Sequence, residues 1–402
     1  MAASGPFEPR PSLAVAVSGG ADSMCLAVLA RDWVLARGGS LLALVVDHGL
    51  RAESADEAAL TLSRLTTLRI PARQLTVIGL SRGAGLAARA RAARYEVLLQ
   101  ACADAGRLHL LLGHHAADQA ETLMIRVLSG SGGRGLAGMP AVHEAATVRL
   151  LRPLLAVPPA VLRAFLTDAG VPWVEDPSNA DRRALRPRIR SLRDNDAGGT
   201  KTLAEAANAA GRHRAAGDLA IGRVLAERVV MRPEGFAILS PGAIAPEALA
   251  ALIRTVAGAD FAPGTGQLAT MAADPGPCTV WGVRILPAGR LGRGWLVVRE
   301  AAAIGDAVEA RHGVIWDGRF RLHAAHAPLE GLTIGALGDD ARAIRRRPGL
   351  PVAVLRTLPA LRRGNVLVAV PHLDYPDFSA FQGVRLVFNP PHPLASAPFL
   401  PA

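Results

Sequence analysis

The sequence predicts an α/β protein. Its N-terminal part is expected to be a doubly wound parallel sheet, followed by a helical segment and a mixed, β-rich C-terminal region. Two observations support this prediction. Over the first 130 residues, short apolar runs alternate with segments of helical length, which is typical of parallel βαβ units. Beyond residue 195 the composition changes, first to alanine-rich stretches and then to a region richer in valine, proline and glycine.

The expected elements follow in order along the chain. Strands are predicted at 13–17, 41–46, 73–79 and 108–113, and helices at 22–36, 54–68, 85–106, 116–130, 158–169, 201–230 and 246–258. Ser54 and Glu57 have the spacing of a capping box, which opens the second helix. Because ligands bind at the carboxyl ends of strands in such sheets, the residues at 18–23, 47–48 and 114–118 are the first candidates for a site.

These shifts in pattern predict three domains. We expect a catalytic domain over 1–195, a helical RNA-binding domain over 196–275, and a mixed α/β domain over 276–402 that also contacts RNA. No apolar run reaches the roughly 18 residues that a membrane-spanning helix requires. The first residues lack a basic start followed by an apolar stretch. The expected location is therefore the cytoplasm.

The charge points to a polyanionic partner. The net charge is +11, and Lys201 is the only lysine, so nearly all of the positive charge is arginine. A GC-rich genome explains arginine in place of lysine, but not the excess of bases over acids. That excess favours RNA or DNA as a partner. The three cysteines, Cys25, Cys102 and Cys278, form no CxxC pair and are expected to be apolar thiols in the protein interior.

The segment "SGGADS", residues 18–23, follows the first strand and opens the first helix. Its glycines allow a tight turn that brings backbone N–H groups close to a ligand, and a helix N-terminus favours phosphate. Ser18 and Ser23 add hydroxyl groups. Asp22 would repel a bare phosphate unless a metal ion or a backbone N–H occupies it, which indicates Mg²⁺ binding or helix capping. The loop lacks the GK[ST] of the common phosphate loop.

This loop resembles the phosphate loop of the ATP pyrophosphatase superfamily, whose members cleave ATP between the α- and β-phosphates. Five further segments are similar, in order, to the tRNA(Ile)-lysidine synthetase family: "VVDHGLRAESADEA" (45–58), "ARAARY" (90–95), "GHHAADQAETLMIRVLSGSGGRGLAGM" (113–139), "RPLL" (152–155) and "EDPSNAD" (175–181). The segments "VIWDGRF" (314–320) and "LPALRRGNVLVAVPHL" (358–373) are less specifically similar to the family's C-terminal region. The resemblance implies an adenine nucleotide alpha hydrolase-like fold for the first domain.

The resemblance also implies a reaction. ATP adenylates the ring carbonyl oxygen of the first anticodon cytidine in an isoleucine tRNA with a CAU anticodon, and pyrophosphate is released. Free L-lysine then attacks the activated carbon through its ε-amine, and AMP leaves. The implied cofactors are ATP and Mg²⁺, the partners are this tRNA and lysine, and a homodimer is left open.

The resemblance assigns roles residue by residue. ATP would be bound by Ser18, Gly19, Gly20, Ala21, Asp22, Ser23, Asp47 and His48, with Asp22 as the Mg²⁺ ligand. The catalytic candidates are Asp118, His114, His115 and Arg91. The substrate-binding candidates are Arg94, Arg152, Glu175, Asp176 and Asn179. Asp181 also falls in a matching motif, and Glu175 or Asp176 would pair with the lysine ammonium.

Plainer interpretations accompany several of these roles. Asp47 could be a turn residue and His48 a partly buried histidine; Arg91 and Arg94, with Tyr95, could form a solvated basic face. Gln119 and Glu121 could be solvated helix residues. The HHxxD spacing could bind a metal, although an adenylation site more naturally uses a histidine against phosphate charge and an aspartate for Mg²⁺ or a proton. Ala117, Ser129 and Pro187 depart from the family's usual residues.

Three other functions compete with this one. A tRNA thiolase would need a reactive cysteine or a cysteine-bound cluster, for which no CxxC exists. An ammonia-using synthetase of the NAD or GMP type would not need the +11 charge. A non-enzymatic, arginine-rich RNA-binding protein would not need to keep the loop or Asp118.

Overall fold

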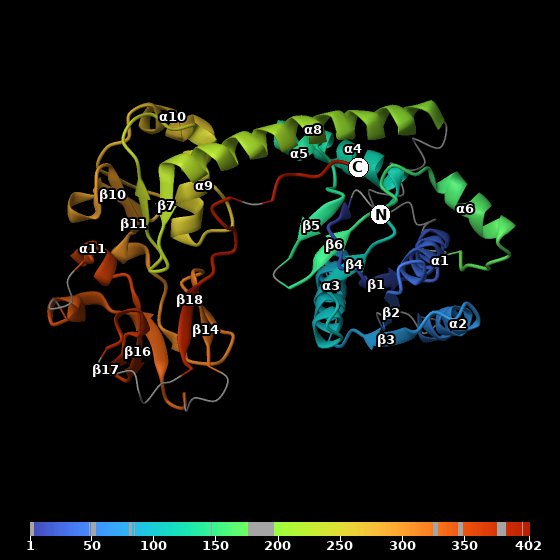
Figure 1. Cartoon of the computed structure of the whole chain (residues 1–402), viewed down its shortest axis with the longest axis horizontal. Helices are drawn as coiled ribbons and strands as arrows, with labels where there is room; N and C mark the ends of the chain where they lie inside the picture. The colour runs from blue at the N-terminus through green and yellow to red at the C-terminus, as the bar shows by residue number, and fades with distance from the viewer. Residues whose placement is uncertain are drawn as a thin grey trace. The chain divides into compact units, whose positions relative to one another are not determined.

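A computed structural model describes residues 4–47, 49, 54–79, 83, 85–145, 147–175, 197–324, 329–344, 349–375, 383–395 and 397–402. The chain divides into two compact units, the first made of 1–216 and 397–402 and the second of 217–396. The division falls inside one helix, α8 (Ala197–Arg228), which is continuous in Figure 1. The division into three domains at residues 195 and 275 stays a prediction.

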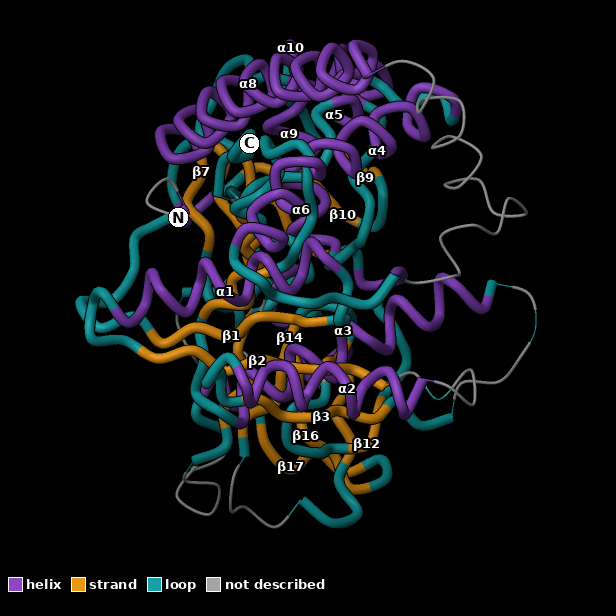
Figure 2. Tube along the Cα trace, turned by 90° about the vertical axis from the view of Figure 1, so that its right-hand side faces the viewer, coloured by secondary structure: helices purple, strands orange, loops and turns teal. Residues whose placement is uncertain are grey.

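The first unit is built on one six-stranded sheet with the strand order β3-β2-β1-β4-β6-β5. All neighbouring strands are parallel except β5 and β6, which are antiparallel. Figure 2 shows β1, β2 and β3 lying side by side. Besides α8, its elements are β1 (Ser12–Val17), α1 (Ala21–Leu35), β2 (Ser40–Asp47), α2 (Ser54–Thr67), β3 (Ala72–Thr76), α3 (Leu86–Asp104), β4 (His109–Leu111), α4 (Ala116–Leu128), α5 (Gly133–Leu136), β5 (Val142–Glu144), β6 (Arg149–Leu151) and α6 (Pro159–Asp168).

These elements confirm the predicted doubly wound sheet. The two faces of β1 are both buried: Leu13, Val15 and Val17 pack with residues of α1, α2 and α6, whereas Ala14 and Ala16 pack with α3. Burial on both faces explains why β1 is an uninterrupted apolar run. The strands β5 and β6 were not predicted, because three residues each are too few to show a period.

The second unit confirms the β-rich C-terminal region. Its antiparallel sheets have the orders β7-β8-β11-β10-β9, β12-β15-β16-β17 and β13-β14-β18. The strands are β7 (Val229–Met231), β8 (Ala237–Leu239), β9 (Cys278–Val280), β10 (Val283–Pro287), β11 (Trp295–Arg299), β12 (Val308–Glu309), β13 (Ile315–Trp316), β14 (Phe320–His323), β15 (Thr333–Ala336), β16 (Pro359–Arg363), β17 (Val366–Ala369) and β18 (Arg385–Phe388). The helices are α9 (Pro246–Ala257), α10 (Thr265–Ala273) and α11 (Val352–Leu355), with short 3₁₀ turns at Gly289–Leu291, Ala301–Ala303, Gly338–Arg342 and Pro371–Leu373.

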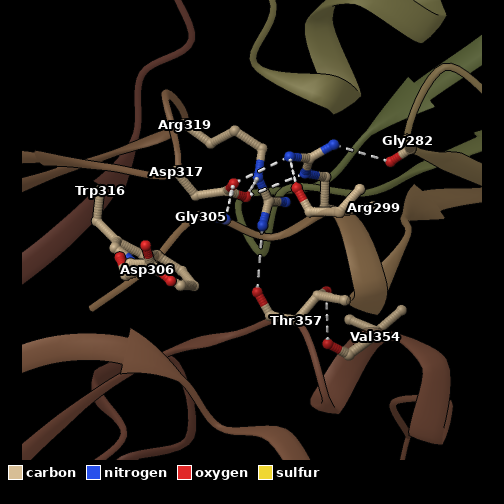
Figure 3. Close-up of polar contacts among 10 residues, drawn as sticks. Gly282, Arg299, Gly305, Asp306, Trp316, Asp317, Arg319, Val354 and Thr357 are labelled. Carbon is tan, nitrogen blue, oxygen red and sulfur yellow. Dashed lines mark hydrogen bonds and ion pairs between the residues drawn. The ribbon is translucent and has the colours of Figure 1, made fainter.

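A buried ion cluster joins elements of the second unit (Figure 3). The Asp317 carboxylate accepts from Arg299 at 3.0 and 3.1 Å and from Nε of Arg319 at 2.7 Å. The Arg319 side chain is fully buried, and burial lowers its pKa to about 10. Arg319 also donates to the carbonyl of Thr357 at 3.3 Å. The cluster therefore ties β11 to the segments before β14 and β16.

Two sequence-based expectations can be compared directly with this structure. Cys25 and Cys102 are buried and Cys278 is partly buried, and all three thiols are free. Among the helices of the described residues, none combines the length and the apolar character needed to cross a membrane.

Candidate active site

The loop at residues 18–23 is closed by its own serines. The Ser18 N–H donates to Oγ of Ser23 at 3.1 Å, and Ser23 Oγ donates to the Gly20 carbonyl at 3.0 Å. Gly20 is the N-cap of α1, and no side chain caps that helix end. The first N–H groups of a helix lack partners within the helix. The buried Ser23 hydroxyl therefore holds the loop together, while the N–H groups of the first turn of α1 and the exposed Ser18 hydroxyl lie at the carboxyl end of β1, which suits a phosphate group.

Two glycines let other segments approach this loop closely. Gly19 has a φ of +84°, and a Cβ there would collide with Oγ1 of Thr61. The Gly19 carbonyl accepts from the Val174 N–H at 2.8 Å, which brings the chain just before Glu175 to the loop. At the end of β4, a Cβ on Gly113 would lie 3.2 Å from the Ser23 backbone. Because β1 and β4 are adjacent parallel strands, their carboxyl ends meet here.

His115 connects the loop to the start of α4. It is the N-cap of that helix, and its N–H donates to Oδ2 of Asp118 at 3.0 Å in a capping box. Its ring Nδ1 accepts from the Asp118 N–H at 3.4 Å, and its Nε2 lies 3.4 Å from Oδ2 of Asp22. The imidazole therefore lies between two carboxylates.

His114 has a different environment. Burial lowers its pKa to about 4, opposed by the Asp118 charge and reinforced by the charges of Arg152, Arg91 and Arg94. Burial and the three arginines therefore disfavour the imidazolium form of His114 in the absence of a bound anion. Its role toward phosphate stays a prediction.

The three arginines form a basic cluster around Tyr95. Arg91 donates to the Tyr95 hydroxyl at 3.4 Å and lies over its ring at 5.2 Å, and Arg152 also hydrogen-bonds to that hydroxyl. Burial lowers the pKa of both Arg94 and Arg152, and the Arg91 charge lowers both further. Only 7% of Arg152 is exposed. Three cations gathered around one half-buried histidine offer a strong site for an anion.

Asp47 and Glu175 have local partners. Asp47 ends β2, and its Oδ1 accepts from the Gly49 N–H at 2.9 Å and from the Ser54 hydroxyl at 2.8 Å, as expected of a turn residue. Glu175 accepts from the Trp173 indole at 3.2 Å. The remaining candidates lie outside the described residues, namely His48, Asp176, Asn179 and Asp181, as does Pro187.

Sequence reasoning did not select Gln119 or Glu121, which it left open as solvated helix residues. Both are buried, at 1% and 2% exposure. Gln119 holds the backbone of Met139 on both sides, accepting from its N–H at 2.7 Å and donating to its carbonyl at 2.8 Å. The sequence held one signal for this contact: Gln119 and the glycine-rich segment up to Met139 lie in the same family motif, 113–139.

The metal interpretation of HHxxD finds no support in this geometry. Within the part of the chain that the structure describes, no group of three or more histidine, cysteine or acidic residues is placed to hold a metal. Asp22 and Asp118 supply carboxylates on either side of His115. Mg²⁺ is usually held by one or two carboxylates together with substrate phosphates, so these residues fit Mg²⁺ that arrives with a nucleotide.

Comparison with known proteins adds family information. Residues 3–193 match the PP-loop domain family. The chain is 46% identical over 188 residues to a tRNA(Ile)-lysidine synthase of Bradyrhizobium diazoefficiens, covering 46% of this chain and 52% of that protein. It is 34% identical over 402 residues to the Brucella suis tRNA(Ile)-lysidine synthase, covering 92% and 88% of the two chains. It is also 34% identical over 382 residues to that of Ruegeria pomeroyi, covering 90% and 89%.

The extent of these matches differs between relatives. The chain spans about half the length of the Bradyrhizobium protein, and that match covers less than half of this chain. The Brucella and Ruegeria matches extend over most of both chains, so they include the second unit.

Proposed function

Since this chain belongs to the tRNA(Ile)-lysidine synthase family, we propose that it joins free L-lysine to the first anticodon cytidine of a CAU-anticodon isoleucine tRNA at the expense of ATP. The supporting observation is the chain of contacts from Asp22 through His115 to Asp118. It joins a phosphate-type loop to the start of α4, where His114 interacts electrostatically with Asp118 and with Arg91, Arg94 and Arg152 of the basic cluster. ATP bound at the loop and the tRNA cytidine bound at the basic cluster would bring the α-phosphate and the base together.

The first step is adenylation. The ring carbonyl oxygen of the cytidine attacks the α-phosphorus of ATP, an O–P bond forms, and pyrophosphate leaves. The 18–23 loop binds the phosphates through the N–H groups at the start of α1 and the Ser18 hydroxyl, while Ser23 keeps the loop closed. Asp22 would hold Mg²⁺, which would neutralise phosphate charge. The His115 ring lies beside the Asp22 carboxylate, with Nε2 3.4 Å from Oδ2, and would help to position it.

The second step is lysine transfer. The ε-ammonium gives up a proton, the amine nitrogen forms a bond to the activated ring carbon, and the C–O bond to AMP breaks. We assign the proton acceptor to Asp118, beside the loop. We assign the ammonium partner to Glu175, because the Val174–Gly19 hydrogen bond brings its segment to the same loop.

The basic cluster binds the RNA. Arg91 is exposed while Arg94 and Arg152 lie deeper, so the cluster leads from the surface toward His114. Arginine pairs readily with phosphate. The neutral His114 ring provides hydrogen bonding to a base instead of charge. Recognition of a single cytidine in an anticodon loop requires a base splayed from its neighbours, which a recessed site of this kind accommodates.

The cysteines disfavour a tRNA thiolase. Burial, and for Cys25 also the Asp22 charge, raises the pKa of Cys25 and Cys102 to about 11. Burial also raises the pKa of Cys278. Such thiols are poor nucleophiles at neutral pH.

The test supplies ATP, labelled lysine and the CAU-anticodon tRNA(Ile). We expect label in the RNA, with AMP and pyrophosphate released in equal amounts. With lysine omitted, pyrophosphate should still be released while AMP stays bound to the RNA. Incorporation of sulfur or ammonia in place of lysine would overturn the proposal, and so would tRNA binding with no ATP turnover.

A further inference from the structure

The segment Met139–Ala141 has a partner for each of its backbone polar groups. Gln119 takes both groups of Met139. The Pro140 carbonyl accepts from Nη1 of Arg152 at 2.9 Å, and the Ala141 carbonyl accepts from the Arg152 N–H at 2.8 Å. Proline has no N–H to satisfy. Two residues of the candidate site therefore hold this segment: Gln119, which lies in α4, and Arg152, which belongs to the basic cluster.

The remaining group, the Ala141 N–H, is hydrogen-bonded to a residue near the end of the sequence. It donates to the Leu400 carbonyl at 2.8 Å. The segment Ala397–Ala402, here called the C-terminal tail, belongs to the first unit although 180 residues of the second unit precede it. Figure 1 shows the end of the chain, in red, beside α8 and close to α4 and α5.

Phe399 anchors the tail to α8. Only 6% of it is exposed. The Arg214 guanidinium lies 4.7 Å from its ring centroid, a cation–π arrangement. A Cβ on Gly211 would lie 2.9 Å from the same ring, so glycine leaves the space that the ring fills. Further along, the Ala402 N–H donates to Oδ1 of Asn208 at 3.2 Å. An aromatic side chain held in this way fixes the carbonyl of the next residue.

We propose that the C-terminal tail is a positioning element of the candidate active site. Through Leu400 it fixes Ala141, and so the Met139–Ala141 segment that holds Arg152. This inference rests on the proposed function, because it takes Arg152 as a substrate-binding residue. A substrate group displaced by about 1 Å can cost on the order of 100-fold in rate, so a loosened carbonyl at Pro140 has a catalytic effect.

The test uses the full chain with Phe399→Ala, and Leu400→Ala as the matched control. Leu400 is 38% exposed, and its backbone carbonyl survives the substitution. We expect Phe399→Ala to lower kcat/KM for tRNA about tenfold or more, with the KM for ATP unchanged. Leu400→Ala should change neither. Phe399→Leu should lower kcat/KM less than Phe399→Ala does. If Phe399→Ala does not fold, Phe399→Leu takes its place in the test.

A double-mutant cycle separates positioning from simple stabilisation. If the tail acts through Arg152, Phe399→Ala and Arg152→Lys together should cost less than the product of their separate effects. Effects that multiply would overturn the inference, as would equal losses with Phe399→Ala and Leu400→Ala.

Hydrogen exchange gives a readout without turnover. We expect Phe399→Ala to speed exchange of the Ala141 amide, with α1 and β1 unchanged. Unchanged exchange at Ala141 would overturn the inference. If exchange rises as expected but the wild-type chain does not form lysidine, the tail still positions Arg152 and the proposed function fails.

Discussion

The Nε2 atom of His115 lies 3.4 Å from the Oδ2 atom of Asp22, which joins the first residues of α4 to the first turn of α1. These two helices begin after adjacent strands, β1 and β4, so the contact lies at the carboxyl edge of the sheet. The carboxyl edge is the usual ligand-binding edge of such sheets. Asp22, His115 and Asp118 therefore form one group of contacting side chains, and each of them can be tested separately.

Asp22→Asn should abolish lysidine formation while tRNA binding stays close to wild type, because the loop loses its charge but not its shape. Asp118→Asn should do the same and should leave the free energy of unfolding close to wild type, since the amide oxygen of asparagine still accepts the His115 N–H of the capping box. Asp168→Asn, an exposed change in the last turn of α6, serves as the control. Loss of tRNA binding in both the Asp22 and the Asp118 variant would show that their roles are misassigned.

His114→Gln should flatten the pH dependence of stability. The pKa of His114 is about 4 in the folded chain, against 6.5 when unfolded. Between these values the unfolded chain binds more protons, so wild-type stability falls as pH drops from about 6.5 toward 4. Glutamine does not titrate, so the variant should lose less stability across that window. Urea unfolding at pH 7.5 and pH 5 measures the difference, and equal losses in both proteins would contradict the assignment.

Arg91→Ala should weaken tRNA binding and make it less sensitive to salt. Loss of one phosphate contact lowers the slope of log affinity against log salt by about 1. Arg73→Ala, on the exposed part of β3, is the matched control and should leave that slope unchanged. Filter binding between low and moderate salt measures both slopes. Equal slopes for the two variants would favour a solvated basic face without a role in binding.

Gly138→Ala should destabilise the first unit more than Gly130→Ala. Both glycines have a φ near +65°, so each substitution strains the backbone similarly. A Cβ at 138 would lie 2.6 Å from Oε1 of Gln119, whereas at 130 nothing lies within 4 Å. The difference between the variants therefore isolates the packing of Gln119 against the Met139–Ala141 segment. Thermal unfolding compares them, and equal melting temperatures would mean that Gln119 can move aside freely.

Asp317→Asn should destabilise the second unit strongly, by about 3–5 kcal/mol, because it leaves Arg299 and Arg319 buried without their carboxylate. Burial alone would raise the Asp317 pKa, but the Arg299 hydrogen bond and the Arg319 charge outweigh it and hold that pKa below its usual value. This contribution is complete above the unfolded pKa and is lost as pH falls through the folded pKa. Acid unfolding of the wild-type and Asp317→Asn proteins tests this: the wild type should lose more stability than the variant as the pH falls.

The core of the first unit could be predicted because its signals are local. The run at 13–17 and the glycines at 19 and 20 determine a strand and a turn by their own chemistry, and the observed elements begin within one residue of the expected positions. His115 and Asp118 sit three residues apart, and that spacing already contains the capping box.

The rest depends on contacts between distant residues. Nothing near Arg152 in the sequence indicates that it hydrogen-bonds to Tyr95 or holds Pro140. The burial of Gln119 depends on a carbonyl twenty residues away. The lowered pKa of His114 follows first from its burial and then from three arginines on two other segments. Spacing shows which residues share an element, but it does not show which elements meet.

The side chain of Lys201 has a practical consequence. It lies near the start of α8 with 82% of its side chain exposed, 3.9 Å from Glu205, and it is the only lysine in the chain. Amine-reactive reagents therefore attach a dye, cross-linker or surface tether to one known side chain, apart from the terminal amine. None of the arginines of the basic cluster reacts with them, so the tagged protein keeps the positive charge of that cluster. The same scarcity gives lysine-directed proteases a single cleavage point, which makes Lys201 a direct reporter of when the N-terminal end of α8 unfolds.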